Sequence, residues 1–230
     1  MKGYKYQYFS TLDSTSDYAK SKRLEKENLI IVAKKQTGGR GTKGRSFSSN
    51  QGGLYLSVLT FYKDFPADRA FEIMQNYASA VCETLVFFGV KPQIKWPNDI
   101  LVGGKKICGI LIENTFSGKY ITSSIVGVGL NITNRLEDEL LSIATTLQMQ
   151  TGKAYTVEEV QEKFLFYLEK GVREKYASYL GFIGERVSLI AGEKEFTVTV
   201  VGVDEKGNLL AEIDGKIQTF ASAEVRLKVQ

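Results

Sequence analysis

A glycine-rich segment with several cations, GGRGTKGRS at residues 38–46, carries the clearest chemical signal in the sequence. Its glycines match G-x-G-x-x-G, the dinucleotide-binding pattern, and residues 39–46 match a P-loop with Arg45 in place of the lysine. In both patterns, backbone N–H groups bind phosphate at the N-terminus of a helix. The segment therefore predicts a contact with an anion, and its surroundings decide which fold presents it.

The spacing after Gly44 excludes both nucleotide-binding folds. Only RSFSSNQGG, residues 45–53, separates Gly44 from the next expected strand, whereas a parallel crossover needs about a dozen residues and usually a helix. The kinase glycine loop lies between two strands, but the H-R-D and D-F-G sequences of kinases are absent. A plain surface hairpin is the alternative. The cations in and beside the segment favour a loop that closes over a polyanion: Lys34, Lys35, Arg40, Lys43 and Arg45.

Two further segments place polar groups beside apolar strands. KWPND at 95–99 combines a cation, the only tryptophan, an amide and an acid, and its proline and asparagine also suit a simple turn. In GGKKICGIL, Lys105 and Lys106 lie at the mouth of an expected hairpin, where exposed lysines are most often solvated charge. Gly109 inside that strand indicates the close approach of a ligand or of another backbone.

The composition narrows the possible chemistry. The 230 residues include no histidine, which excludes Ser-His-Asp and Cys-His catalysis and nearly every zinc enzyme site. Of the two cysteines, Cys108 has apolar neighbours and Cys82 lies on the apolar face of an expected helix, so we expect both to be packing residues. The net charge of +4 is weak for a nucleic-acid-binding protein. With no signal peptide or long apolar run, we expect a soluble, cytoplasmic protein.

Hydrophobic periodicity predicts an α/β fold with a mixed, largely antiparallel sheet. The expected strands are residues 4–9, 29–36, 54–62, 91–99, 119–132 and a hairpin over 100–113 that turns at Gly103 and Gly104. The expected helices are residues 13–28, capped by Ser14 or Thr15, 67–88, ended by Gly89, and about 156–179, which opens with a Thr156–Glu159 capping box.

The last part of the chain has a different pattern. Residues 184–230 alternate in short strands, with turns at DEKGN and IDGK and no helical period. A module of under 50 residues is marginally stable alone, so we expect a small β-barrel that packs against the main domain.

Together these segments resemble biotin protein ligases. The resemblance depends on DST at 13–15, QTGGRGTKGR at 36–45, KWPND, KKICGIL at 105–111 and GVGLN at 127–131, which occur in the family's order with similar spacing over essentially the whole chain. It implies a class II synthetase-like catalytic domain at 1–182 and an SH3-like β-barrel at 183–230.

The resemblance also implies an activity. The family activates biotin with ATP and Mg²⁺ to biotinyl-5′-AMP and pyrophosphate, and then transfers biotin to one lysine of a biotin carboxyl carrier protein domain. A carboxylate must attack the α-phosphate of an anionic triphosphate, and fixed cations can screen that repulsion without histidine. The implied partners are this carrier domain and biotin, with no nucleic acid and no membrane.

The resemblance assigns roles to individual residues. Lys106 and Arg40 are the implied catalytic residues, and Asp99 is a possible magnesium ligand. The implied biotin-binding residues are Ser14, Thr15, Gln36, Gly39, Arg40, Gly41, Lys106 and Gly109. The implied ATP-binding residues are Arg40, Arg45, Lys95, Trp96, Asn98, Asp99, Lys106 and Asn131.

One position departs from the family's usual G-R-G-R-x-G-R loop: Thr42 stands where the second arginine is usual, so that arginine's role is not carried over. Because DST begins at residue 13, we expect a ligase without the DNA-binding domain of some family members. The nearest rival is a lipoate protein ligase. A rival of another class is a non-enzymatic nucleic-acid-binding module, which would show salt-sensitive affinity. Whether the protein is a monomer or a dimer stays open.

Overall fold

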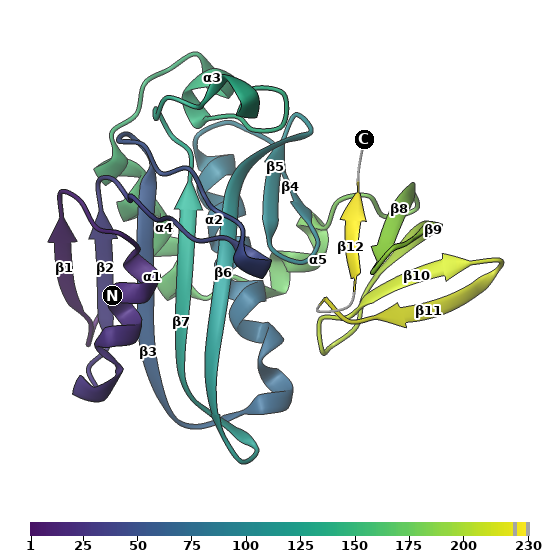
Figure 1. Cartoon of the computed structure of the whole chain (residues 1–230), viewed down its shortest axis with the longest axis horizontal. Coiled ribbons are helices and arrows are strands. Elements are labelled where there is room, and N and C mark those ends of the chain that lie inside the picture. Colours follow the sequence, from purple (N-terminus) through teal and green to yellow (C-terminus); the bar gives the residue numbers. More distant parts are fainter. Residues whose placement is uncertain (223–224, 229–230) are drawn as a thin grey trace.

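The computed structural model describes residues 1–222 and 225–228, which form two β-sheets with helices packed on the larger one (Figure 1). The larger sheet has the order β1-β2-β3-β7-β6-β5-β4. Its strands are β1 (Lys5–Phe9), β2 (Leu29–Ala33), β3 (Leu54–Pro66), β4 (Pro92–Lys95), β5 (Asp99–Val102), β6 (Lys105–Ser117) and β7 (Tyr120–Leu130). Only β1 and β2 pair in parallel, so the expected mixed, largely antiparallel sheet is confirmed.

Alternating residues of β2 explain why the sheet needs cover on both faces. Ile30 and Val32 belong to the main core with helices α2 (Phe71–Phe87) and α4 (Val157–Lys170). Leu29 and Ile31 pack on the other face, in a second core with Ala19 of α1 (Thr15–Ser21). Figure 1 shows α1 on the opposite side of the sheet from α2 and α4. This helix α1 provides the crossover between the parallel strands and begins beside the site described below.

Local sequence signals account for most element boundaries. Ser14 caps α1 by accepting a hydrogen bond from a backbone N–H of its first turn, and Thr156 forms the expected capping box at α4. Gly103 and Gly104 both have positive φ, as the tight β5–β6 hairpin requires. The remaining helices are short: α3 (Leu147–Thr151), α5 (Tyr176–Tyr179) and the 3₁₀ turns Arg23–Glu25, Thr42–Gly44, Ala67–Arg69, Asp138–Leu140 and Arg173–Lys175.

Three expectations on helices are corrected. Helix α4 ends at Lys170 instead of about residue 179, because Gly171 adopts a positive φ and breaks the helix. Helix α2 begins at Phe71 instead of residue 67, after a 3₁₀ turn. Helix α1 ends at Ser21 instead of residue 28, and a 3₁₀ turn at Arg23–Glu25 follows it. The short helix α3 was not expected. None of the helices that the structure describes is long and apolar enough to span a membrane.

The smaller sheet confirms the expected C-terminal antiparallel module. Its order is β11-β10-β9-β8-β12, with β8 (Arg186–Ala191), β9 (Lys194–Val203), β10 (Leu209–Ile213), β11 (Lys216–Phe220) and β12 (Val225–Lys228). The expected small C-terminal β-domain is confirmed, and no closed barrel is found: among the described residues β11 and β12 are the edge strands. Its apolar face packs around Trp96, which the larger domain contributes.

Candidate active site

Two facing glycines form the floor of the site at the centre of the larger sheet. Gly109 of β6 pairs with Gly129 of β7, and the ring of Phe47 lies over them. A Cβ at Gly129 would be 2.6 Å from this ring, and one at Gly127 would be 2.7 Å from Oγ of Ser16. Contacts this short do not occur, so the glycines permit the close approach of side chains from outside the sheet.

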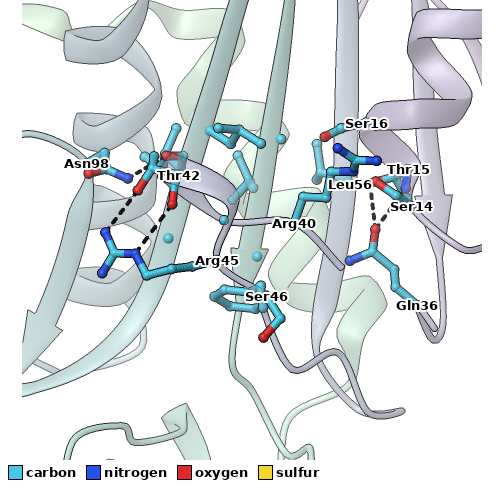
Figure 2. A pocket seen from close by; sticks show the side chains of 18 of the residues that line it. Ser14, Thr15, Ser16, Gln36, Arg40, Thr42, Arg45, Ser46, Leu56 and Asn98 are labelled. Carbon is cyan, nitrogen blue, oxygen red and sulfur yellow. Dashed lines mark hydrogen bonds between the residues drawn. The ribbon is translucent and has the colours of Figure 1, made fainter. Parts of the chain in front are cut away.

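A network of uncharged polar groups forms one end of the site. The backbone N–H and the hydroxyl of Thr15 both donate to Oε1 of Gln36, at 2.8 and 3.0 Å, as Figure 2 shows. Nε2 of Gln36 donates to the hydroxyl of Ser49 at 2.9 Å. Ser57 donates to the hydroxyl of Thr15 at 2.8 Å and shares a hydrogen bond with Ser16. Each group is held by another, so the strands and α1 fix this polar end before any ligand binds.

The glycine loop does not have the conformation of either nucleotide-binding fold. Gly41 N–H donates to the carbonyl of Arg45, and Phe47 N–H donates to the carbonyl of Gly39, so the loop folds back on itself. Residues 45–53, all of which the structure describes, contain no helix. The exclusion of the dinucleotide and P-loop folds is therefore confirmed.

The two loop arginines that line the site bind different partners, one outside the loop and one within it. Nε of Arg40 lies 2.5 Å from a carboxylate oxygen of Asp17 in α1, and the Arg40 side chain is 57% exposed. Arg45 donates to both the carbonyl and the hydroxyl of Thr42, each at 3.3 Å (Figure 2). Thr42, the residue that departs from the family's pattern, thus holds the neighbouring arginine within the loop.

Lys106 is fixed by its backbone and by its side chain. Its N–H donates to the carbonyl of Ile143, and its carbonyl accepts from Thr145, which ties β6 to the segment after β7. Its Nζ lies 2.6 Å from a carboxylate oxygen of Asp99 and 5.7 Å from the centre of the Phe47 ring. The cation therefore lies between the KWPND segment and the glycine floor.

Two cavities meet at this lysine. The first cavity lies over the glycine floor and reaches the polar end. The second cavity lies beyond Lys106, beneath the apolar residues Leu136, Leu140 and Ile143. The two cavities share Arg45, Ser46, Phe47 and Lys106.

The structure brings most of the residues expected at the site to these cavities. Those that line the first cavity are Ser14, Thr15, Gln36, Arg40, Gly41, Arg45, Asn98, Lys106 and Gly109. Those that line the second cavity are Arg45, Lys95, Asp99, Lys106 and Asn131. Gly39 and Trp96 line neither cavity.

The side chains of Trp96 and Asn131 are buried and form hydrogen bonds with other parts of the protein. The indole of Trp96 is 2% exposed, packs with the smaller sheet and donates to the carbonyl of Gly207 at 2.9 Å. The buried amide of Asn131 donates to the carbonyl of Thr145 and accepts from Asn134. Their hydrogen bonds position the chain around the cavities.

Several lining residues were not expected from the sequence. Phe47 could not be identified from the sequence, because a single aromatic residue in a polar loop shows no hydrophobic periodicity. Gly127 and Gly129 stood within the quoted GVGLN segment, but only the pairing of β6 with β7 shows that they face the cavity. The apolar cover at 136–144 lies in irregular structure, for which hydrophobic periodicity gives no signal.

The cysteines are packing residues, as expected. Both are buried, and burial raises the pKa of the Cys108 thiol and of the Cys82 thiol far above the ordinary value. A thiol with so high a pKa is protonated at neutral pH and is a poor nucleophile.

The residues that the structure describes contain no group of three or more His, Cys, Asp or Glu that could hold a metal ion. Asp99, the possible magnesium ligand, is a single carboxylate paired with Lys106. Mg²⁺ commonly binds through one or two carboxylates together with substrate phosphates. The site therefore fits a metal that is held mainly by a phosphate ligand.

The fold and site define a class of protein: an α/β ligand-binding domain in which two cavities meet at a fixed cation. Residues 8–131 match the Biotin/lipoate A/B protein ligase family, and residues 182–228 match the Biotin protein ligase C terminal domain. The chain belongs to the biotin/lipoate A/B protein ligase family, which confirms the resemblance seen in the sequence.

Relatives and solved structures agree with this assignment. The bifunctional ligase/repressor BirA of Bacillus subtilis (strain 168) is 32% identical over an alignment of 217 positions, which covers 87% of this chain and 66% of that protein. The chain thus spans just under two thirds of that relative's length. The biotin–[acetyl-CoA-carboxylase] ligase of Paracoccus denitrificans is 26% identical, over 85% of this chain and 88% of that protein. The biotin protein ligase from Aquifex aeolicus, solved in complex with biotin and ATP, has a TM-score of 0.79 at 30% identity, with 100% of both chains covered.

Proposed function

We propose that this protein activates biotin with ATP to biotinyl-5′-AMP and then transfers biotin to a lysine of a biotin carboxyl carrier protein domain. Residues 1–182 form the catalytic domain in this proposal, and residues 183–230 form the small C-terminal domain. The two free, buried cysteines support a reducing, cytoplasmic setting.

The observation that carries the proposal is the position of Lys106, which lines both cavities. A reaction that joins two anions needs a cation where they meet, since the attacking carboxylate and the α-phosphate repel each other. Biotin occupies the first cavity and the nucleotide occupies the second, so that Lys106 contacts the biotin carboxylate and the α-phosphate. Arg40 and Arg45 add positive charge from the loop.

The polar end of the first cavity supports biotin over lipoate. The ureido group of biotin has N–H donors and a carbonyl acceptor, which match the hydroxyls and amide of Ser14, Thr15 and Gln36. The dithiolane ring of lipoate has no N–H donor and no carbonyl acceptor, so it would gain none of these hydrogen bonds. The match of residues 182–228 to a biotin protein ligase C-terminal domain supports the same choice.

Both chemical steps balance without an acid–base histidine. In the first, a biotin carboxylate oxygen bonds to the α-phosphorus and pyrophosphate leaves with the bonding electrons. In the second, the carrier lysine amine bonds to the acyl carbon, loses a proton, and AMP leaves. Asp99 would be the protein ligand of a Mg²⁺ ion bound together with ATP, and that ion would supply positive charge beside the phosphate oxygens.

The test measures pyrophosphate release by the protein with ATP, Mg²⁺ and either biotin or lipoate. We expect release that depends on biotin and, with a carrier domain present, a carrier that gains the mass of one biotinyl group. Release with lipoate but not with biotin would contradict the substrate assignment, and release with neither would contradict the proposed function.

A further inference from the structure

The hydrogen-bond network of the polar end includes two serines that the proposed function does not use. Ser57 of β3 is fully buried and does not line the first cavity, whereas Ser16 of α1 lines it. Their hydroxyl oxygens lie 3.0 Å apart. Gly127 leaves room for this pair beside the cavity, because a Cβ there would be 2.7 Å from Oγ of Ser16 and 3.5 Å from Oγ of Ser57.

A backbone donor fixes the direction of the hydrogen bonds in this network. The backbone N–H of Thr15 can only donate, so the Gln36 side-chain atom that it contacts at 2.8 Å must be the amide oxygen. The hydroxyl of Thr15 contacts the same oxygen at 3.0 Å and therefore also donates to it. The only proton of the Thr15 hydroxyl is thus committed to Gln36.

This direction determines the protons of Ser57 and Ser16. Because the Thr15 hydroxyl has no proton left, Ser57 must be the donor in its 2.8 Å contact with Thr15. Ser57 has no second proton, so Ser16 must be the donor in the contact between the two serines. The Ser16 hydroxyl then keeps its lone pairs but has no free proton. Toward a ligand in the first cavity, Ser16 can only accept a hydrogen bond.

Two other residues of the polar end keep protons that a ligand can use. Gln36 has two amide protons, and one of them binds the hydroxyl of Ser49, which in turn donates to the carbonyl of Phe47. The hydroxyl of Ser14 accepts from the backbone N–H of Asp17. For the second amide proton of Gln36 and the hydroxyl proton of Ser14, no acceptor is found among the described residues. The polar end therefore combines free donors with an obligate acceptor, which is the complement of a cyclic urea.

We propose that Ser16 accepts a hydrogen bond from a ureido N–H of biotin, and that Ser57 is a positioning residue that holds the Ser16 hydroxyl in this acceptor role. This inference rests on the proposed function. The ureido carbonyl beside that N–H accepts the free protons of Gln36 and Ser14. A ligand with an acceptor atom in place of the N–H would instead face the lone pairs of Ser16, and the two acceptors would repel each other.

The experiment compares, by calorimetric titration, biotin with two cyclic carbamate analogues, in each of which an oxygen replaces one ureido N–H. We expect the wild type to bind one of these analogues about 100-fold more weakly than biotin, because its ring oxygen would oppose Ser16. Ser57→Ala frees the Ser16 proton, so discrimination against that analogue should fall by about tenfold, while biotin binds about fivefold more weakly. The matched control is Ser124→Ala, which alters a fully buried serine of β7 whose hydroxyl has no hydrogen-bond partner among the described residues.

The outcomes separate this inference from the proposed function. If the wild type binds biotin but Ser57→Ala behaves like Ser124→Ala, or weakens biotin and both analogues by the same factor, the inference is wrong and the function stands. If the wild type binds no biotin, the proposed function fails instead. Neutron diffraction from the deuterated protein without ligand then tests the direction of the network. A deuteron on Ser57 that faces Thr15 supports the acceptor role of Ser16, and one that faces Ser16 contradicts it.

Discussion

The polar end of the first cavity and the glycine loop differ in how their functional groups are held. Thr15, Gln36 and Ser57 are linked to one another: Thr15 begins α1, Ser57 lies in β3, and Gln36 follows β2. The tip of the loop bonds mainly to itself, and Arg40 forms an ion pair with Asp17 of α1. One region is therefore preorganised for a neutral polar ligand, and the other supplies charges that can rearrange around an anion.

This difference suits the order of the proposed reaction. A preformed polar end can select biotin without closing, because the strands already fix its donors and acceptors. The loop cations are useful only once triphosphate is present, and a loop that opens also lets products leave.

Lys106 lies where the two regions meet, so its removal has the largest expected effect. Lys106→Ala should lower the rate of adenylate formation by at least about 100-fold, the size typical of losing one group that stabilises transition-state charge. Burst measurements of adenylate, with circular dichroism to check the fold, test this. Lys105→Ala is the matched control, because its side chain donates instead to the carbonyl of Leu141. A near-normal rate for Lys106→Ala would refute its catalytic role.

The glycine floor of the first cavity, which adjoins the preorganised polar end, is tested by filling the space above it. Gly129→Ala would place a Cβ against Phe47, so we expect the KM for biotin to rise by about tenfold, as displacing a packed ring costs on the order of 1–3 kcal/mol. Gly202→Ala in β9 is the control, because no atom lies within 4 Å of its added Cβ. An unchanged KM for biotin in Gly129→Ala would show that the floor tolerates rearrangement.

The loop is tested through its link to α1. Asp17→Asn removes the charge opposite Arg40 and should speed dissociation of the adenylate by about threefold, since exposed ion pairs are worth little. Glu25→Gln, which removes another exposed pair close to α1, is the control. The measurement is the dissociation rate of pre-formed adenylate. Equal rates in both variants would show that Asp17 does not help the loop to retain the adenylate.

The smallest expected effect is on the rate at which a protease cleaves the glycine loop. Trypsin should cleave after Arg40 or Arg45 more slowly when biotin and ATP are both present, because the loop orders around them. Biotin alone should change little. Equal cleavage with and without both ligands would favour the surface-hairpin alternative.

The sequence predicted the parts of the molecule that local rules determine. The Gly103–Gly104 hairpin and the Thr156 capping box follow from the backbone needs of adjacent residues. The expected helix at α4 extended past its observed end at Lys170, because apolar residues continue beyond Gly171 to the buried Tyr176. These residues are buried although the chain has already left the helix.

For the site, the sequence identified chemically distinctive residues but not the direction in which each one faces. Lys106 and Asp99 come together because β5 and β6 form a hairpin. Trp96 lies three residues from Asp99 in the chain, yet its ring packs with the smaller sheet, because a contact between domains determines its position. Phe47 reaches the floor only because Gly129 has no side chain, a dependence between residues far apart in the sequence.

The most direct test of the account is to identify the small molecule that the protein holds after incubation with ATP, Mg²⁺ and biotin, without a carrier domain. The account predicts biotinyl-5′-AMP by mass spectrometry, and no adenylate when lipoate replaces biotin. Recovery of lipoyl-AMP, or of unreacted ATP and biotin alone, would contradict it.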